Sequence, residues 1–418
     1  MRALLAMALA LGLLVVLLYR RVRVGRAMLC CAIALAVLLG VSPREMAHSL
    51  AYELRDPSVG FTQTTPWLFV SLTALLLGVS VLGAIMQHTG ISQRLITALY
   101  GLFRSRRAAI TGLPLLMGML PTPGGIMLSA PMVRDLGDSI GLERSRQAAV
   151  NFYFRHLWEP VWPLFPAIPL AQGILGVSAI SIIRYNLIIS LAGVVAGAVF
   201  LLLFGMPPRT EKSVPPGRRL HHNIRDLAHA FWPIALTTAL YAALNIPPAG
   251  GIALSILGLL VLHRVPRSKW RDLFRAANEP EMVLLVFSAL FFKLNLQAAG
   301  AVPQVVAFFQ QVNMPPALII FLLPLLVGFL SGVTMPTVAM TFPFLAAFIG
   351  TGPNAKMPLE TLAFSGLLSG ILLTPVHLCL PLSAGYFQTP LQRIIVRLIA
   401  PTLLTALIVA AAVYILVR

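Results

Sequence analysis

Apolar stretches of about 15 to 27 residues alternate with short charged segments along the whole chain. A helix of about 20 apolar residues crosses the roughly 30 Å hydrocarbon core of a bilayer. The pattern therefore predicts an all-α polytopic membrane protein with about ten transmembrane helices. The predicted spans are residues 2–19, 27–41, 67–87, 147–173, 179–204, 229–245, 250–264, 281–298, 361–387 and 398–417.

Two further apolar stretches, 108–131 and 316–350, contain helix-breaking residues near their middle. In the first, the run Pro121-Thr-Pro-Gly-Gly125 ends a helix of about 13 residues, which reaches only about 20 Å into a membrane. Each stretch is predicted to be a re-entrant hairpin that returns to its own side. Unpaired backbone at that depth is stable only against protein or a water-filled cavity, so the hairpin tips are predicted to line a site.

The hairpin motif and a second motif both occur twice. The segment 113–118 recurs as 323–328 after 210 positions, and 159–166 shares three residues with 374–381 at an offset of 215. We predict a first repeat at 1–204, a basic cytoplasmic linker at 205–228 and a second repeat at 229–418. The spans at 147–173 and 361–387 are each predicted to be broken, at Glu159–Pro160 and Thr374–Pro375. Paired Gly/Pro-interrupted apolar segments are typical of the binding site of a secondary transporter.

Composition and charge support the membrane class and give an orientation. The chain is 58% hydrophobic and 11% charged, with a formal net charge of +18. Nucleic acid is not predicted as a partner, because the basic residues lie in short loops between apolar spans. With the N-terminus outside, 23 of the 31 Lys and Arg residues lie on the inside, as the positive-inside rule requires. The two repeats are then inverted, and the predicted location is the cell inner (cytoplasmic) membrane.

The sequence contains no motif for a disulfide framework, a metal site, nucleotide hydrolysis or a serine nucleophile. The three cysteines, Cys30, Cys31 and Cys379, lie in apolar runs without disulfide or metal spacing, so we expect them to pack. No phosphate-binding glycine loop, His-Glu-x-x-His metal motif or Gly-x-Ser-x-Gly nucleophile occurs. The prediction is therefore a protein that is not an enzyme and has no cofactor, driven by a gradient of Na⁺ or H⁺ rather than by ATP.

The candidate substrate and ion sites lie at the hairpin tips and helix breaks. Exposed N–H groups at helix N-termini suit anions, and C-terminal carbonyls suit small cations. The predicted substrate-binding residues at these places are Thr122, Pro123, Gly124, Gly125, Thr334, Thr337 and Thr374, and Ser331 is predicted to bind the coupling ion. The alternative is that these hydroxyls only cap their own helices.

A second group of candidates is ionisable. Asn151 and Arg155 are predicted to bind substrate, and Glu159 to couple an ion; at an i,i+4 spacing, Arg155 and Glu159 share a helix face, and a purely structural ion pair is the alternative. His377 is a candidate proton carrier, with a hydrogen-bonded core histidine as the alternative. Lys293 either snorkels or pairs with Glu159.

The order of hairpin, broken span, basic loop, hairpin and broken span resembles the ion transporter superfamily. That superfamily includes gluconate permeases, divalent-anion/sodium symporters, citrate symporters and the large subunits of TRAP transporters. The runs Asn151-Phe-Tyr-Phe-Arg-His-Leu-Trp-Glu-Pro-Val-Trp-Pro-Leu-Phe-Pro166 and Pro121-Thr-Pro-Gly-Gly-Ile-Met-Leu-Ser-Ala-Pro131 are similar to an uncharacterised family of prokaryotic integral membrane proteins placed there. The resemblance implies elevator-type exchange and a homodimer.

These observations together predict a secondary active transporter that moves a small organic anion, a carboxylate or sugar acid, by cation-coupled alternating access. A transporter of a neutral or amino-acid solute is the alternative within transport. An intramembrane enzyme acting on lipid-linked substrates is the alternative from another class, and it requires a polar cluster near one membrane face.

Overall fold

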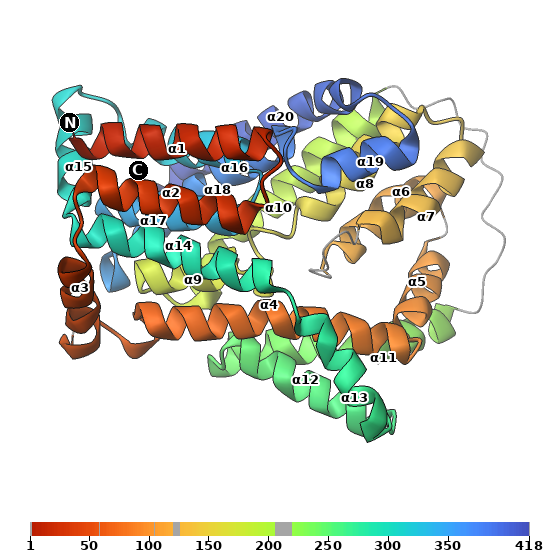
Figure 1. Ribbon diagram of the computed structural model, residues 1–418. Helices are drawn as coiled ribbons and strands as arrows, with labels where there is room; N and C mark the ends of the chain where they lie inside the picture. Colours follow the sequence, from red (N-terminus) through yellow and green to blue (C-terminus); the bar gives the residue numbers. More distant parts are fainter. Residues whose placement is uncertain (1, 58, 104, 120–125, 205–219, 418) are drawn as a thin grey trace.

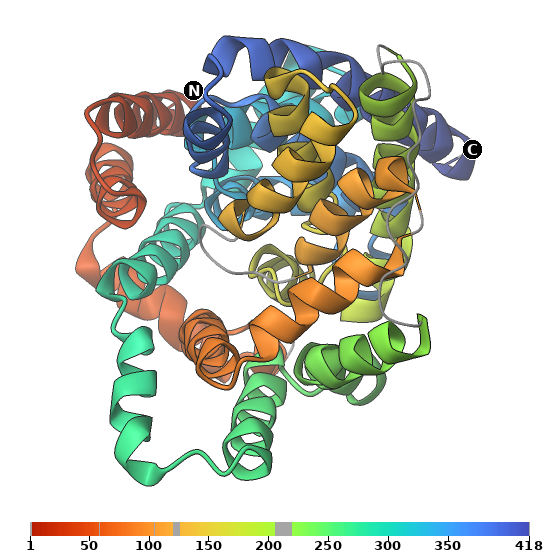
Figure 2. The ribbon, with the colours of Figure 1, turned by 90° about the vertical axis from the view of Figure 1, so that its right-hand side faces the viewer.

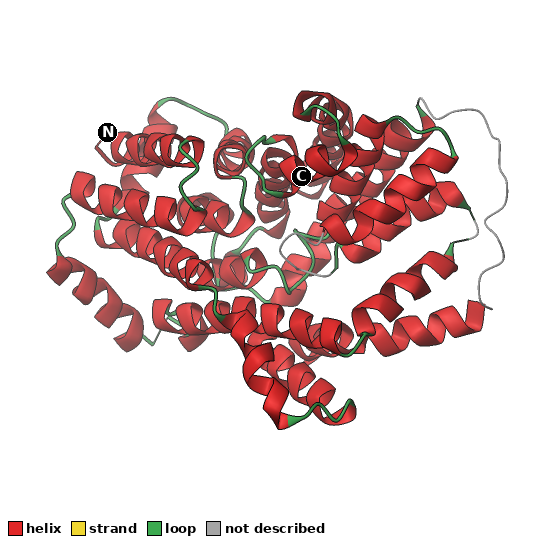
Figure 3. Ribbon diagram, turned by 45° about the vertical axis from the view of Figure 1, so that its right-hand side comes forward, coloured by secondary structure: helices red, strands yellow, loops and turns green. Residues whose placement is uncertain are grey.

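The computed structural model describes residues 2–57, 59–103, 105–119, 126–204 and 220–417, and every regular element among them is a helix (Figure 3). The first half contains α1 (Arg2–Tyr19), α2 (Val24–Leu39), α3 (Pro43–Arg55), α4 (Thr65–His88), α5 (Ile91–Leu102), α6 (Arg106–Met117), α7 (Ile126–Ser139), α8 (Arg144–His156), α9 (Ala167–Leu175) and α10 (Ala179–Gly197). The second half contains α11 (Leu220–Leu244), α12 (Pro248–Leu262), α13 (Arg267–Phe274), α14 (Pro280–Ala298), α15 (Ala301–Gln311), α16 (Pro316–Ser331), α17 (Thr334–Ile349), α18 (Met357–Leu373), α19 (Cys379–Phe387) and α20 (Leu391–Val417).

Six of the described helices are long and apolar enough to cross a membrane: α1, α4, α10 with its π-helical continuation, α11, α14 and α20. The number is seven if α2 and α3, which are bent by 105° at their junction, form one span. The predicted all-α, multi-pass membrane character is thus confirmed. The predicted number of ten spans also includes shorter and broken helices, and it stays a prediction.

Between the predicted spans 27–41 and 67–87 the charged residues 42–66 predict a polar loop, but the structure forms helix α3 there. Its start is a capping box, in which the Ser42 hydroxyl accepts from the Glu45 N–H at 3.2 Å and the Glu45 carboxylate accepts from the Ser42 N–H at 2.7 Å. Because one face of α3 is polar, the helix contains no continuous apolar run, and a search for such runs does not find it. Helix α13 likewise lies between the predicted spans 250–264 and 281–298, where the basic residues predict a loop, and α11 begins inside the predicted linker.

A buried ion pair fastens α3 to the helices beside it. Lys293 on α14 donates to Glu53 at 3.0 Å, and the backbone N–H of Thr65 donates to the same carboxylate at 2.7 Å. Only about 5% of either charged side chain is exposed. The expected alternatives for Lys293, snorkelling or pairing with Glu159, are therefore wrong, because its partner lies on the helix that was taken for a loop.

The helix breaks fall where proline and glycine predicted them. Helix α8 ends at His156 and α9 begins at Ala167, across a segment with Pro160, Pro163 and Pro166. Between α18 and α19 lies the shorter break at 374–378. Helix α16 ends at Gly332, which has a left-handed φ of +67°, and α17 starts two residues later and packs back on α16. The predicted tip of the first hairpin, 121–125, lies outside the described residues.

The helices around the breaks contact each other reciprocally between the halves. Helix α9 packs on α17, and α7 packs on α19; α8 packs on α20, and α10 packs on α18. Figure 1 shows α1, α2 and α14 side by side, with α3 near the end of α14. Figure 2 places α12 and α13 at the edge of the molecule, away from α19 and α20. The second break, directly before α19, therefore lies away from this edge.

Candidate functional site

The polar residues of α8 fasten it to the first hairpin. Asn151 is fully buried; its side chain accepts from the Ser129 hydroxyl at 2.6 Å and donates to the carbonyl of Ile126 at 3.2 Å. Both partners belong to the first turn of α7, directly after the predicted hairpin tip. The structure thus gives Asn151 a positioning contact at the start of α7. The other predicted substrate-binding residues of this tip, Thr122, Pro123, Gly124 and Gly125, lie outside the described residues.

Arg155 joins α8 to the other arm of that hairpin. Its guanidinium is buried and donates to the carbonyl of Met117, the last residue of α6, at 2.9 Å. A cation at this position stabilises the negative end of the helix dipole. The contact is close, since a Cβ on Gly118 would lie 2.2 Å from the Arg155 carbonyl oxygen. Arg155 therefore holds the end of α6 at the break of α8.

Glu159 lies in the turn after α8, and not on the helix face that was assumed for it. The helix ends at His156, so the i,i+4 geometry expected for Arg155 and Glu159 is wrong, although the two charges interact electrostatically. One carboxylate oxygen of Glu159 lies 3.8 Å from Nε2 of His156. The other is buried and has no hydrogen-bond partner among the described residues. Glu159 therefore has an acceptor that is available to a ligand.

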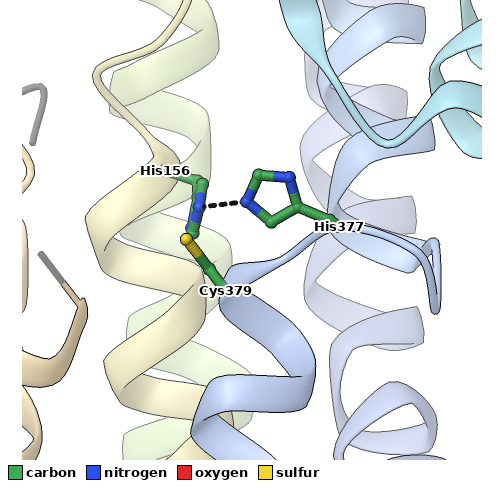
Figure 4. A group of neighbouring side chains, drawn as sticks. All are labelled: His156, His377 and Cys379. Atoms are coloured by element: carbon green, nitrogen blue, oxygen red, sulfur yellow. Dashed lines mark hydrogen bonds between the residues drawn. The ribbon is translucent and has the colours of Figure 1, made fainter. Parts of the chain in front are cut away.

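Two histidines from the two halves meet at the breaks. Nε2 of His156 and Nε2 of His377 are 2.9 Å apart, and the residues are 221 positions apart in the chain (Figure 4). Nδ1 of His156 lies 2.6 Å from the carbonyl oxygen of Phe152, and Nδ1 of His377 lies 2.6 Å from that of Gly332. A carbonyl oxygen only accepts, so each Nδ1 carries a proton and donates. The predicted site residue His377 is thus brought to the break of the first half.

Cys379, the first residue of α19, completes this group. Its Sγ and one ring nitrogen of each histidine all lie within 4.8 Å of one another. Figure 4 shows the sulfur directed toward the ring of His156. The sequence predicted only packing for this cysteine, because a search by spacing cannot find ligands that come from opposite halves. We call His156, Glu159, His377 and Cys379 the break cluster.

The predicted hydroxyls of the second hairpin bond mainly to their own backbone. Thr337 donates to the Val333 carbonyl at 2.8 Å and lies 3.1 Å from the Ser331 hydroxyl. Thr374 donates to the Phe329 carbonyl of α16, and Thr334 is a nearly buried residue at the start of α17. These contacts give Thr337 a local bond to the backbone of its own helix, which favours the structural alternative over a ligand contact, although the bond is not a cap, and they give Thr374 a helix-joining role.

Sequence reasoning missed a second buried acid beside the first break. Glu360 of α18 is fully buried and accepts from the Asn186 amide at 3.2 Å, and the same amide donates to the Pro160 carbonyl at 3.0 Å. The contact joins α18 and α10 to the break of the first half. Glu360 could have been identified from the sequence, because it is a carboxylate within an otherwise apolar stretch.

Comparison with known proteins adds a family assignment. No curated protein sequence matches the chain. A family model described as a protein of unknown function, DUF401, matches residues 3–417, which is nearly the whole chain. The chain therefore belongs to the DUF401 family of proteins of unknown function.

Proposed function

We propose that this protein is a secondary active transporter of the ion transporter superfamily, which moves a small organic anion across the cytoplasmic membrane by cation-coupled alternating access. The observation that carries the proposal is the meeting of two broken helices and a hairpin end around buried polar side chains. Arg155 and His156 come from the end of α8, His377 from the break after α18, and the Gly332 carbonyl from the end of α16. Non-helical backbone amid apolar helices is typical of a transporter binding site.

The contacts between the halves support an inverted repeat. The first hairpin, broken helix and final helix are α6–α7, α8–α9 and α10, and their counterparts are α16–α17, α18–α19 and α20. Under this alignment, the contact of α9 with α17 corresponds to that of α7 with α19, and the contact of α8 with α20 to that of α10 with α18. Reciprocal contacts of this kind are what a pseudo-twofold axis between two repeats produces.

The charges and helix ends support an anionic substrate. Arg155 is a buried cation at the meeting point, and it lies directly before the break. Helices α9, α17 and α19 begin directly after the two breaks and the turn that follows α16, so their N-terminal N–H groups lie next to those segments. Such N-termini and a guanidinium both favour a carboxylate. Carbonyl and hydroxyl oxygens at the end of α16 are the donor type that a small coupling cation takes.

The proposal is tested by transport in proteoliposomes that contain the purified protein. Radiolabelled carboxylates and sugar acids are supplied under an imposed sodium gradient or an imposed pH gradient, and binding candidates are first selected by thermal shift. We expect gradient-dependent accumulation of an anion. Accumulation of none of these anions, or equal uptake with and without either gradient, overturns the proposal.

Substitutions of Arg155 test whether the meeting point of the broken helices takes part in transport. Arg155→Gln is expected to reduce uptake of the anion at least about tenfold, since it removes a buried charge, and Arg155→Lys should restore part of it. Arg275→Gln is the matched control, because Arg275 is exposed and pairs with Asp272 at the surface. Unfolding midpoints in detergent separate lost transport from lost folding. Full uptake by a folded Arg155→Gln protein would remove Arg155 from the site.

A further inference from the structure

The two histidines of the break cluster face each other through two ring nitrogens that are both hydrogen-bond acceptors, so neutral rings cannot form a hydrogen bond there. Each Nδ1 donates to a backbone carbonyl, so in the neutral ring each Nε2 carries a lone pair. The two Nε2 atoms nevertheless lie 2.9 Å apart, with His156 buried and His377 half-buried. Two lone pairs at this distance repel each other unless a positive centre lies between or beside them. The geometry therefore requires a cation, which is either a shared proton or a metal ion.

We propose that His156, His377 and Cys379 bind a divalent transition-metal ion of the zinc class, with Glu159 supplying a carboxylate oxygen as the fourth ligand. The inference stands on the geometry of His156, His377 and Cys379, with Glu159 placed beside them by its 3.8 Å distance to Nε2 of His156, and it is independent of the transport proposal. It also assigns a role to a group that a shared proton leaves unexplained. A proton between the rings would make the Glu159 carboxylate, 3.8 Å from Nε2 of His156, its counter-ion, but it does not use the Cys379 sulfur.

The hydrogen bonds around the two rings are those of metal-binding histidines. In known sites, the ring nitrogen that does not bind the metal commonly donates to a backbone carbonyl or a carboxylate, which fixes the tautomer and the ring orientation. Phe152 and Gly332 supply such carbonyls here, each at 2.6 Å from Nδ1. Both rings are thus held with Nε2 directed to one point before any ion binds.

The distances fit a tetrahedral ion after small side-chain movements. With Zn–N bonds of about 2.05 Å and a Zn–S bond of about 2.3 Å, tetrahedral ligands lie about 3.3 Å apart for two nitrogens and about 3.6 Å apart for nitrogen and sulfur. The two Nε2 atoms are 2.9 Å apart, and all three ligand atoms lie within 4.8 Å of one another. The rings therefore separate by a few tenths of an ångström and the sulfur approaches by up to about 1.2 Å.

The donor set selects the class of metal. Two imidazoles and a thiolate are borderline and soft ligands, which favour zinc and its neighbours over magnesium or calcium. Arg155 interacts electrostatically with both Cys379 and Glu159 and so stabilises the anionic forms that bind metal. On binding, the thiol proton of Cys379 leaves to solvent as the sulfur–metal bond forms. The bound ion would join the end of α8 to the start of α19, across the two halves.

Cobalt(II) provides a direct test, because a thiolate bound to tetrahedral Co²⁺ gives a charge-transfer band in the near ultraviolet and intense d–d bands in the visible. The purified full-length protein is titrated in detergent with CoCl₂, and the cobalt is then displaced with ZnCl₂. We expect one equivalent of Co²⁺ to produce both sets of bands and Zn²⁺ to abolish them. Zn²⁺ should also raise the midpoint of thermal unfolding. A wild-type protein with neither bands nor a Zn²⁺-dependent shift overturns the proposal and leaves the shared proton.

Matched variants assign the ligands. His156→Asn and His377→Asn delete Nε2 but keep a side-chain N–H near the position of Nδ1, and Cys379→Ala deletes the sulfur. Each should weaken Co²⁺ binding by more than about tenfold, since even changes behind the ligands cost 10–100-fold. The controls are His48→Asn and Cys30→Ser, both at exposed positions.

The variant results are decisive in either direction. Loss of the charge-transfer band in Cys379→Ala, with the band retained in Cys30→Ser, supports the assignment. Unchanged cobalt spectra in folded His377→Asn and Cys379→Ala proteins refute it. If a variant does not fold, the wild-type spectrum still decides whether a thiolate and nitrogen ligands hold the metal.

Discussion

Gly332 is the residue at which the backbone geometry of the second hairpin can be tested most directly. It ends α16 with a φ of +67°, and its carbonyl accepts from Nδ1 of His377 at 2.6 Å. A Cβ built at this position lies 2.9 Å from the His377 backbone nitrogen and 3.1 Å from the His377 Cα and the Val376 carbonyl carbon. Gly332→Ala therefore introduces both backbone strain and a clash with the second break.

The two effects can be estimated separately. The left-handed conformation costs a residue with a Cβ about 1–2 kcal/mol. Contacts at 2.9–3.1 Å are shorter than the ordinary 3.4 Å and involve backbone atoms that cannot rotate away, so the overpacking costs a further 1–3 kcal/mol or so. Restricting the unfolded chain returns about 0.4–1 kcal/mol. The expected net loss of unfolding free energy is about 3 kcal/mol.

Denaturant unfolding in detergent, followed by tryptophan fluorescence, measures this loss. Gly300→Ala is the control for strain alone, since Gly300 has a φ of +55° and no atom within 4 Å of a built Cβ; it should lose about 1 kcal/mol. Gly12→Ala has neither penalty and should be as stable as the wild type or slightly more stable. If Gly332→Ala is no less stable than Gly300→Ala, the close approach of α16 to the second break is refuted.

Three further predictions concern other parts of the molecule. Lys293→Met should lose about 3–5 kcal/mol of unfolding free energy because Glu53 stays buried without its partner, and the added change Glu53→Gln should recover most of it; a stable single variant would contradict the pairing. The hydrogen bond from Ser145, followed by the charge of nearby arginines, holds the pKa of Glu143 below its usual range. The stabilisation that ionised Glu143 contributes is complete above the unfolded pKa of about 4.3 and is lost as the pH falls through the lower folded pKa. Glu143→Gln should therefore make the unfolding free energy fall less steeply on the acid side of a stability–pH curve. Parallel curves for the variant and the wild type would refute the effect. Ser42→Ala should destabilise α3 by about 1 kcal/mol and Ser42→Gly by only a few tenths, as measured by unfolding; equal losses would exclude a capping role.

Local chemistry explains which elements the sequence predicts well. Proline and glycine end helices wherever the rest of the chain lies, so the breaks at 157–166 and 374–378 and the turn after α16 fall at or next to the predicted residues. Helix α3 was missed because a 13-residue amphipathic helix has no apolar run. Its capping box was visible in the sequence as Ser42 followed three positions later by Glu45, with Pro43 between them. A helix predicted from that signal would include Glu53. Glu53 would then be a candidate partner for Lys293.

The break cluster could not be predicted, because its members come from opposite halves. Spacing rules find ligands within one or two turns of a helix, whereas His156 and His377 are 221 positions apart. The offset of the repeat does not help, since a shift of 215 pairs His377 with Trp162 and not with His156. The two histidines come from places that do not correspond in the proposed repeats, the end of α8 and the break after α18. Only tertiary structure shows that contact.

The same offset indicates how the proposed repeats have diverged. Asn151 and Arg155 of α8 correspond to Gly366 and Gly370 of α18. A Cβ on either glycine would lie within 2.4 Å of a backbone carbonyl oxygen of α16, so α18 and its hairpin pack backbone against backbone. In the first half, the corresponding side chains are polar and reach the ends of α6 and α7 instead. Both halves thus pack closely at the hairpin, since a Cβ on Gly118 would also lie 2.2 Å from the Arg155 carbonyl oxygen, but only the first half adds the polar side chains at these two positions. The polar groups at these positions are therefore not repeated by twofold symmetry, which agrees with the proposal of a solute that has one charged end.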